Sequence, residues 1–596
     1  MRTEFITWFI LVTTLTVFCS ITIPVHSQCL EDQKSLLLQL KNSLQFDPNH
    51  SVKFQWNSRL TRLVKLDLSN HSDEFSGKRE LQIEKSNLFT LFCNLSGIKE
   101  LYLDGINISA NGYEWGHAIS FALPNLRVLS LRDCLLSGPI DSSLQNLQFL
   151  SELYLHSNNL SVPVPDFLAN FANLTVLTLS SCNLYGTFPK VIFEKVQTLE
   201  TLHLFANLLL NGSFPNFPQN MSLRELALSD TRFSGNLPES IGNLMELRTI
   251  AISGCLFSGQ IPNSLANLSQ FVIVDLSDNN FSGPIPSFQG WKKLTDISLS
   301  LEISLSDNKF SGQMTGFSNE SLSPLDTLDL SSNKLQGPIP SYFFDFQSLA
   351  SLSLSFNNFS GTIQLESFQR LQNIFSLDLS YNSLIVNASV TDSSLSSFPQ
   401  LNELGLASCK LQKFPPLMNQ SSLYDLDLSN NQISGLTPNW IWNISGGFPY
   451  ALNLSCNLLV GFQPEFSLPR FDILDLHSNQ LQGEIPMPPE IAMYVDYSRN
   501  NFSSSIPAEI GKSIASAFFF SLSDNMLSGP IPPAICNGSG LELQGEMPIP
   551  PESIDYVVDY SRNNFSSSFP AEIGKSIASA SFFSLSDNML SGPIPP

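Results

Sequence analysis

The side chains most able to take part in chemistry lie at alternate positions of short segments in which every second residue is apolar, most often leucine. In the N-terminal half these positions carry carboxylates, aromatic rings, imidazoles and one guanidinium, at Glu100, Tyr102, Asp104, Arg132, Glu152, Tyr154, His156, His203, Phe205 and Glu225. Such alternation places the apolar residues on one face of a β-strand and the polar residues on the other. Aromatic and charged residues on neighbouring strands suit a protein or peptide ligand. We therefore predict noncovalent binding here; the alternative interpretation is a variable surface without a ligand.

No catalytic chemistry is predicted. The sequence lacks H-E-x-x-H, a phosphate-binding loop, G-x-S-x-G and the kinase signatures. Its seven histidines are scattered, and two of them lie near the N-terminus. We therefore expect no catalytic residue, no metal and no cofactor.

Charge excludes two classes of partner. The chain has 596 residues and a formal net charge of −22, with 52 acidic against 30 basic side chains. Nucleic acids and anionic lipid surfaces attract proteins through Lys and Arg patches, so neither is predicted as a partner. Much of the negative charge comes from Asp in recurring LDLS and LSDN phrases, so it is spread along the chain. It indicates repulsion of acidic partners, not a specific preference for basic ones.

One phrase fills most of the chain. Among its copies are LRVLSLRDCLLSGPI from Leu126, LRELALSDTRFSGNLP from Leu223, FVIVDLSDNNFSGPIP from Phe271 and LYDLDLSNNQISGLTP from Leu423. The consensus is L-x-x-L-x-L-x-x-[NC]-x-[LF]-[SQ]-G-x-[IL]-P. It recurs about every 24 residues, in about 21 copies across residues 58–596, and it is the leucine-rich repeat signature.

Each position of the phrase has a physical reason. Stacked x-L-x-L-x segments form a parallel sheet, the glycine permits positive φ, and the proline favours an extended segment. On the far side, L-x-x-L-x-x-L has the period of 3₁₀ turns. The sequence therefore predicts an α/β fold, a curved leucine-rich repeat solenoid with a parallel β-sheet on its concave face and short 3₁₀ and loop segments on its convex side.

The residue that follows each strand is predicted to form a buried structural ladder. An amide there can satisfy turn backbone groups, each of which would otherwise cost about 1–3 kcal/mol. A cysteine at the same position serves as a small, weak donor and is not expected to bind metal. The ladder comprises Asn158, Asn207, Asn279, Asn333, Asn357, Asn431 and Asn479, together with Cys134, Cys182, Cys255 and Cys409.

The N-terminus is typical of a secretory signal. Residues 1–27 combine a basic start, a short apolar stretch and small residues before the expected cleavage after Ser27, the alternative being an uncleaved anchor. No later stretch is long and apolar enough for a transmembrane helix. About nineteen N-x-[ST] sites agree with the secretory route. Those we single out are Asn94, Asn107, Asn173, Asn211, Asn267, Asn387 and Asn443.

The period is broken in four places. Residues 28–57 read as an N-terminal cap with a helix from Cys29, residues 291–305 crowd two strand phrases together, and residues 389–399 form a Ser-rich loop. Near the C-terminus, residues 481–533 and 543–596 are near-identical duplicates that share VDYSRNNFSSS and SLSDNMLSGPIPP. A solenoid needs a polar terminal cap, so this end is expected to fray or aggregate.

Several motifs resemble one plant family. The SGxIP repeat and the segment CLEDQKSLLLQLKNSL from Cys29 are similar to extracellular plant receptors. LYLDGINIS from Leu101, LPNLRVLSLRDCLLSGPI from Leu123, NWIWNISGG from Asn439 and YVDYSRNN from Tyr494 resemble the Verticillium wilt resistance-type receptor-like proteins. The resemblance covers nearly the whole chain. It implies a cell-surface immune receptor that senses a microbial protein or peptide and signals through partner receptor-like kinases.

The sequence departs from that family at both ends. The cap of the family continues into a segment with paired cysteines, whereas Trp56 and Asn57 lead directly to a repeat, so Cys29 lacks its expected partners. The loop region, terminal cap, membrane helix and cytoplasmic tail of the family are not found, and there is no kinase domain. We expect a product of the secretory pathway that is extracellular or at the cell surface, although the anchor of the family is missing.

Three hypotheses therefore stand. The leading one is the ligand-recognition ectodomain of a receptor-like protein in pathogen defence. The second is a secreted inhibitor of microbial cell-wall-degrading enzymes that uses the same concave face. The third is a non-functional fragment of a receptor gene, which the near-exact duplication supports.

Overall fold

The computed structural model divides the chain into two compact units, Met1–Thr295 (unit 1) and Asp296–Pro596 (unit 2). The residues that it describes are 44–46, 63–69, 81–83, 88–92, 95–286, 301–314, 325–388, 398–447, 450–489, 492–514, 517–532, 557–566 and 582–591. The predicted signal peptide, the predicted cap helix, Asn94 and most of the Ser-rich loop lie outside these residues. No helix of the described part has the length and hydropathy needed to cross a bilayer.

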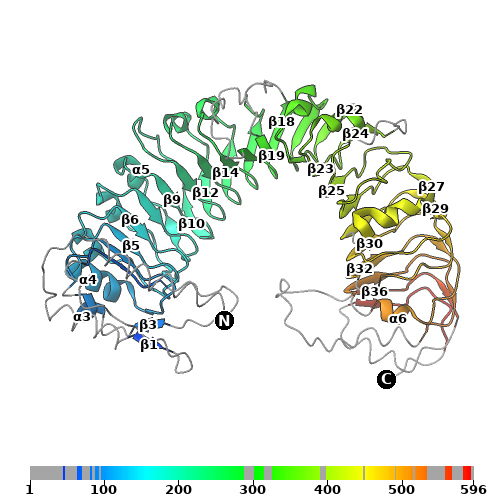
Figure 1. Ribbon diagram of the computed structural model, residues 1–596, viewed down its shortest axis with the longest axis horizontal. Helices are drawn as coiled ribbons and strands as arrows, with labels where there is room; N and C mark the ends of the chain where they lie inside the picture. The colour runs from blue at the N-terminus through cyan, green and yellow to red at the C-terminus, as the bar shows by residue number, and fades with distance from the viewer. Residues whose placement is uncertain are drawn as a thin grey trace, which may run out of the picture. The chain divides into compact units, whose positions relative to one another are not determined.

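The main sheet of unit 1 is parallel and follows the order of the chain (Figure 1). The inward side chains of adjacent strands pair directly, as in Leu101, Leu129 and Leu153, and all three are fully buried. Its strands are β2 (Lys65–Asp67), β4 (Glu100–Tyr102), β5 (Val128–Ser130), β6 (Glu152–Tyr154), β7 (Val176–Thr178), β9 (Thr201–His203), β11 (Glu225–Ala227), β13 (Thr249–Ala251) and β15 (Ile273–Asp275).

Unit 2 repeats this arrangement. Each strand pairs in parallel with the next without a slip in register, apart from one irregularity between Leu301 and Glu302. The strands are β17 (Leu301–Ser304), β19 (Leu325–Asp329), β21 (Ser351–Ser353), β23 (Ser376–Asp378), β25 (Glu403–Gly405), β26 (Asp425–Asp427), β28 (Ala451–Asn453), β30 (Ile473–Asp475), β32 (Tyr494–Asp496), β34 (Phe519–Ser521), β36 (Val557–Asp559) and β38 (Phe582–Ser584).

A second set of parallel strands was not predicted. It is built from the FSG part of the repeat, where glycines such as Gly235 and Gly283 have positive φ and the flanking residues are extended. In unit 1 these strands are β8 (Tyr185–Thr187), β10 (Leu209–Gly212), β12 (Arg232–Gly235), β14 (Leu256–Gly259) and β16 (Asn280–Gly283). In unit 2 they are β18 (Lys309–Gln313), β20 (Lys334–Gly337), β22 (Asn358–Gln364), β24 (Ser383–Asn387), β27 (Ser434–Thr437), β29 (Leu458–Phe462), β31 (Gln482–Gly483), β33 (Asn501–Phe502), β35 (Ser528–Gly529) and β37 (Asn564–Phe565).

The far side of the repeats carries short helices, as the period of three predicted. The 3₁₀ helices are η2 (Ser142–Asn146), η3 (Asp166–Asn170), η4 (Glu239–Asn243), η5 (Asn263–Asn267), η6 (Ser341–Asp345), η7 (Leu365–Arg370) and η9 (Asn439–Gly447). In the part of the chain that the structure describes, α-helices replace them at α3 (Leu88–Phe92), α4 (Gly112–Ala122), α5 (Val191–Lys195) and α6 (Ile510–Ser513). Helix α4 begins with a capping box, in which Asn111 and Glu114 each accept the backbone N–H of the other.

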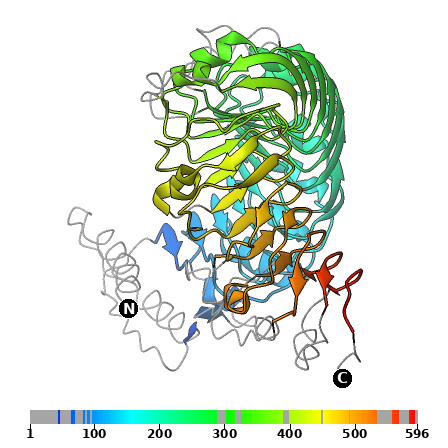
Figure 2. The ribbon, with the colours of Figure 1, turned by 90° about the vertical axis from the view of Figure 1, so that its right-hand side faces the viewer.

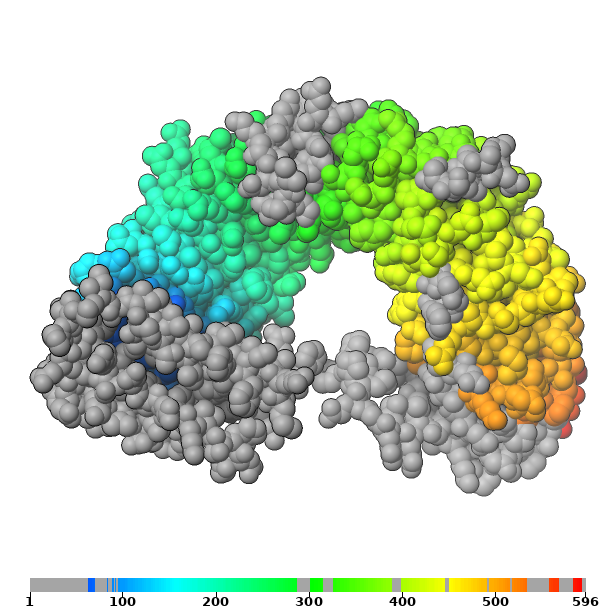
Figure 3. Space-filling view, viewed as in Figure 1, coloured from blue at the N-terminus to red at the C-terminus, as the bar shows by residue number. Residues whose placement is uncertain are grey.

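Within each unit the turns of the solenoid pack directly on one another (Figures 2 and 3). Near the N-terminus, β1 (Leu44–Phe46) is antiparallel to β3 (Leu81–Ile83). Along unit 1, stacked rings extend the leucine core, with Phe214 and Phe257 5.1 Å apart between ring centroids and Phe257 and Phe281 6.2 Å apart. Each repeat therefore buries its apolar residues against its two neighbours.

The ladder amides hold adjacent repeats together. The amide nitrogen of Asn207 donates to the carbonyls of Leu179 and Leu204 at 2.9 and 2.7 Å. Its Oδ1 accepts from the backbone N–H groups of Cys182 and Leu184 at 3.1 and 2.9 Å. The other ladder amides likewise donate to a carbonyl of the preceding repeat. Their oxygens accept from one or two N–H groups of that repeat.

The ladder cysteines are buried thiols with backbone partners. The sulfur atoms of Cys134, Cys182 and Cys255 lie 3.1, 3.2 and 3.3 Å from carbonyl oxygens of the preceding repeat. Burial raises the pKa of the Cys182 thiol to about 11 and that of Cys409 to about 12. These thiols therefore stay protonated at neutral pH and are unreactive.

Replacing Asn207 with Ala should destabilise unit 1 by about 3 kcal/mol or more, because it leaves several buried backbone groups without a partner. Urea unfolding followed by circular dichroism measures the change. The matched control is Asn146→Ala on the exposed part of η2, which should change the unfolding free energy by less than about 0.5 kcal/mol. Equal effects of the two substitutions would contradict the ladder.

Candidate functional site

The ten residues predicted to recognise a ligand are together called the N-terminal patch. Six lie on β4, β6, β9 and β11, and the other four lie two residues after the ends of β4, β5, β6 and β9. The strand register sets them in rows. One row runs through Tyr102, Ser130, Tyr154, Thr178 and His203 on five adjacent strands. A second row runs through Glu100, Val128, Glu152, Val176, Thr201 and Glu225. The structure therefore brings the predicted residues onto one face of one sheet.

The first strands of the patch form a charged and aromatic cluster. The Nζ of Lys65 lies 3.5 Å from Oε2 of Glu100 and 4.3 Å from the centroid of the Tyr102 ring. Burial and the neighbouring carboxylate of Glu100 raise the pKa of Tyr102 to about 12. Lys65 was not among the predicted residues, although it occupies the same outward position as Glu100 one strand earlier.

Asp104 has a supporting role, not the contact role that the sequence predicts. Its side chain is 4% exposed. Its Oδ1 accepts from the hydroxyl of Ser130 at 2.6 Å, and its Oδ2 accepts from Nε of Arg132 at 2.8 Å. The second guanidinium nitrogen of Arg132 is also 2.8 Å from Oδ2. Asp104 thus fixes the guanidinium group of Arg132, and the Arg132 side chain remains half-exposed to solvent.

The centre of the patch is occupied by Tyr154 and His156. The Tyr154 hydroxyl donates to Oε2 of Glu152 at 2.9 Å, and burial together with this bond raises the pKa of Tyr154. Nδ1 of His156 lies 2.9 Å from the hydroxyl of Thr178. Burial, followed by the charge of Arg132, lowers the pKa of His156 from 6.5. His156 is therefore neutral at pH 7 and offers a hydrogen bond without a charge.

The far end of the patch is more open. Nε2 of His203 lies 3.2 Å from Oε2 of Glu225, and the rings of His203 and Phe205 are 6.3 Å apart. Phe205 is 41% exposed, which leaves an aromatic ring in contact with solvent. The arrangement offers fixed hydrogen-bonding groups beside exposed rings, and this combination suits binding to another polypeptide.

The predicted glycosylation positions differ in exposure. Asn173, Asn267 and Asn443 are exposed and lie in or beside the short helices of the far side. Asn107, Asn211 and Asn387 are half-buried. The six described positions therefore include three that are exposed.

The aspartates of the recurring LDLS phrases in the middle repeats have a structural role. Each accepts the backbone N–H of the residue two positions later, as Asp329 does from Ser331 at 2.9 Å and Asp427 from Ser429 at 2.8 Å. They terminate the strand by satisfying a backbone donor, which is a known function of this side chain. The sequence signal for this structural role is the LDLS phrase, in which Ser always stands two residues after Asp.

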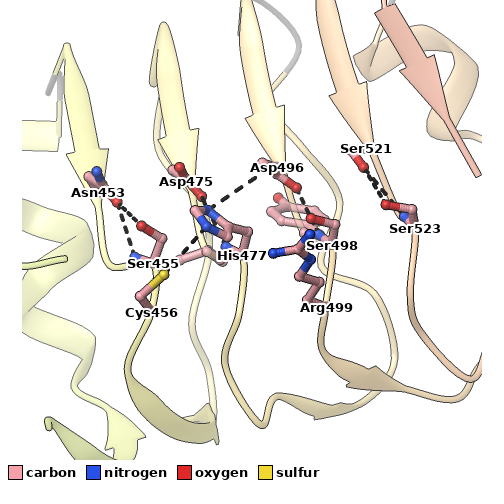
Figure 4. A network of polar contacts seen from close by, with 12 residues as sticks. Asn453, Ser455, Cys456, Asp475, His477, Asp496, Ser498, Arg499, Ser521 and Ser523 are labelled. Carbon is pink, nitrogen blue, oxygen red and sulfur yellow. Dashed lines mark hydrogen bonds and ion pairs between the residues drawn. The ribbon is translucent and has the colours of Figure 1, made fainter. Parts of the chain in front are cut away.

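One group in unit 2 has donor atoms of the kind that metals bind (Figure 4). Atoms of Asp475, His477 and Asp496 lie within 4.8 Å of one another. However, Oδ1 of Asp475 already accepts from the backbone N–H of His477 at 3.0 Å and contacts its Nδ1 at 2.7 Å. Asp475 and Asp496 raise the pKa of His477, and the hydrogen bond that the ring makes to Asp475 is the largest cause. The group is therefore satisfied as an internal network of hydrogen bonds and charges, and it is not assigned as a metal site.

Sequence comparisons identify both the repeat and its relatives. Matches to the leucine rich repeat cover residues 323–384, 125–147, 222–244, 246–268 and 422–444. Receptor-like protein 6 of Arabidopsis thaliana is 32% identical over 501 residues, which are 73% of this chain and 49% of that protein. Receptor-like protein 31 of Arabidopsis thaliana is 46% identical over 206 residues, covering 34% and 23% of the two chains. The chain spans about half the length of the first of these relatives and less of the second.

Solved structures with the same fold are plant receptors. The plant peptide hormone receptor RGFR1 in complex with RGF2 has a TM-score of 0.61 at 28% identity, covering 87% of this chain and 82% of that one. The Arabidopsis receptor kinase HAESA, in complex with the peptide hormone IDA and the co-receptor SERK1, has a TM-score of 0.58 at 25% identity and covers 95% of both chains.

The stacked parallel strands and the repeat matches define a leucine-rich repeat protein. Within this class, the chain belongs with the plant leucine-rich repeat receptor-like proteins. The narrower assignment to the Verticillium wilt resistance type stays a prediction.

His156 gives the patch a measurable pH dependence. Because its pKa in the folded state lies below 6.5, its contribution to stability is present above that pH and is lost as the pH falls through the folded-state pKa. The free energy of unfolding of the wild type should therefore fall more steeply under acid than that of His156→Gln. Proton NMR titration gives the pKa directly, and Arg132→Gln should raise it. A His156 pKa at or above 6.5 would show that the ring is not held as described.

Proposed function

We propose that the chain is the extracellular ligand-recognition ectodomain of a plant cell-surface receptor-like protein in pathogen defence. It binds a microbial protein or peptide on the concave face and signals through partner receptor-like kinases. The observation that carries the proposal is the N-terminal patch, whose side chains are fixed by hydrogen bonds before any ligand arrives. Fixed groups lose little conformational freedom on binding, so more of the contact energy appears as affinity.

Binding accounts for the chemistry of the patch better than catalysis does. Its imidazoles contact a hydroxyl and a carboxylate, which holds both rings in place as hydrogen-bonding groups for a ligand. Two structural relatives, RGFR1 and HAESA, are described in complex with peptide hormones, and the HAESA complex also contains a co-receptor. These comparisons support a polypeptide ligand and a co-receptor for this chain.

The proposed extracellular location agrees with the accessible sequons. If the chain passes through the secretory pathway, Asn173, Asn267 and Asn443 are the positions best exposed to glycosylation. Substituting Asn173 with Gln should lower the mass of the secreted chain by one glycan in an electrophoretic or mass-spectrometric measurement. Asn183→Gln, which lies outside any sequon, should leave the mass pattern of the glycans unchanged. Secretion without any glycan would count against this location.

The binding role of the patch can be tested with the double variant Tyr154→Ala/His156→Ala. Loss of both central side chains should weaken ligand binding about tenfold or more, since central interface residues each contribute about 2 kcal/mol. The measurement is the dose–response of plants that express each variant in a full-length receptor and are exposed to microbial culture filtrate. Phe149→Ala, which removes a 52% exposed ring beside η2 on the far side, serves as control. An unchanged response of the double variant would refute this siting of the ligand.

A further inference from the structure

The outward face of unit 2 changes character along the chain. The first outward position of each main-sheet strand is polar from β17 to β26, at Glu302, Thr327, Ser351, Ser376, Glu403 and Asp425. From β28 onward the same position is apolar throughout the described strands. The residues at this position on the last five strands are named here the apolar lane. They are Ile473, Tyr494, Phe519, Val557 and Phe582.

The apolar lane is continuous because its members are direct partners in the strand register. The rings of Tyr494 and Phe519 stack at 4.4 Å between centroids with an angle of 10° between planes. Phe582 is 52% exposed and the other members are half-buried. Apolar side chains at outward positions of a solvent-facing sheet row are uncommon unless another molecule covers them.

Carboxylates lie two residues further along three of the five apolar-lane strands, at Asp475, Asp496 and Asp559, whereas β34 and β38 carry Ser521 and Ser584 at this position. Together with Asp427 on β26, which precedes the apolar lane, these carboxylates are named here the acidic lane. In each of them one oxygen accepts a backbone N–H two residues later, at 2.8 to 3.0 Å. Burial raises the pKa of Asp427 and Asp496, and neighbouring carboxylates add to the effect.

Little basic charge compensates the acidic lane. Arg499 lies 3.9 Å from Asp524, and Arg562 lies 3.4 Å from the same residue and 3.7 Å from Asp587, all beyond the strand ends. His477 contacts Asp475 and, at 4.0 Å, Asp496 (Figure 4). Within the described residues, Asp427 and Asp559 take part in no ion pair. This face thus combines an apolar row with carboxylates at a separation of about 7 Å, of which Asp559 is half-buried while Asp475 and Asp496 are 9% and 7% exposed.

We propose that these two lanes bind an extended cationic peptide segment, with aliphatic or aromatic side chains on the apolar lane and Lys or Arg side chains on the acidic lane. Strands lie about 4.8 Å apart, so the five strands from β30 to β38 span about 19 Å, the length of about six extended residues. A second copy of this chain is disfavoured by its net charge of −22, and anionic membranes are repelled by the carboxylates. The inference rests on the proposed binding role and gives it a second surface with a defined ligand chemistry.

The probe is a set of three synthetic twelve-residue peptides, and the readout is the dissociation constant of the purified chain by calorimetry. The first peptide alternates Lys with Phe and Leu, the second has Glu in place of Lys, and the third has Ser in place of the apolar residues. The first should bind at least about tenfold more tightly than either of the others, because it alone satisfies both lanes.

The variants change both copies of the duplicated segment together. Phe519→Ser/Phe582→Ser should weaken the Lys-Phe-Leu peptide about tenfold, and Asp496→Asn/Asp559→Asn should weaken it about fivefold. Asn is compatible with the fold, since Asn453 occupies this strand position and accepts the N–H of Ser455 at 3.0 Å. Circular dichroism and the melting temperature confirm that each variant is folded.

The matched control removes the same charge elsewhere on the same unit. Asp329→Asn/Asp378→Asn changes two carboxylates at the equivalent strand position, each accepting an N–H at 2.9 Å, but beside Thr327 and Ser376 in place of apolar residues. It should change the affinity less than twofold.

Equal weakening by the control and the lane variants would show general charge attraction and overturn the site. Unchanged affinity of Phe519→Ser/Phe582→Ser for the Lys-Phe-Leu peptide would also overturn the site. Self-association of the wild type that is lost in this variant would overturn it too, because the apolar lane would then be a contact between two copies of the chain. The test uses direct binding, whereas the N-terminal patch is tested by plant response. The lane variants could lose the Lys-Phe-Leu peptide while plants that carry Tyr154→Ala/His156→Ala respond normally. That result would support the two lanes as a binding site and reject the N-terminal patch.

Discussion

The hydrogen bonds of the ladder amides are the constraint on which the rest of the structure depends. Each amide donates to carbonyls of its own repeat and of the repeat before it, and its oxygen accepts from one or two N–H groups of that preceding repeat. A repeat that shifted by one residue would lose these bonds and turn its leucines toward solvent. The polar ladder and the leucine core therefore impose the same register. Burial of the leucines supplies stability, and the amides supply the direction in which each turn must stack.

This shared register makes the outward surface regular. Because Tyr102, Tyr154 and His203 occupy equivalent positions, they fall into one row although about fifty residues or more of sequence separate the first two from the last. Neighbours in a row lie about 4.8 Å apart, which brings carboxylates and phenols within hydrogen-bonding or electrostatic reach. The raised pKa of Tyr102 and the lowered pKa of His156 follow from that closeness and from burial. Surface chemistry is thus set by which residue each repeat carries at a given outward position.

Much of the main sheet could be predicted from sequence because the alternation of leucine is strict. The second set of strands could not, since FSG contains few apolar residues and its pairing depends on how closely successive turns approach. The burial of Asp104 was not predicted, because alternation gives the direction of a side chain but not its partners. Ser130 and Arg132 bury this carboxylate, and both belong to the next repeat. Lys65 and the apolar lane occupy outward strand positions that the same alternation predicts. They were not among the predicted residues, because the prediction was based on the charged and aromatic residues around Tyr154.

The near-identical segments of unit 2 have a consequence for how the chain reaches its native connectivity. The strand β30 pairs with β32, yet β36 carries almost the same inward residues, with Val558 and Tyr560 in place of Val495 and Tyr497. A folding chain therefore has two nearly equivalent successors for β30, and choosing the later one would loop out the first copy. The entropy of closing a longer loop grows slowly with its length, so it discriminates weakly between the two. We expect a kinetic partition between the native order and this shortened isomer, which would appear as a slow refolding phase that deletion of one copy removes.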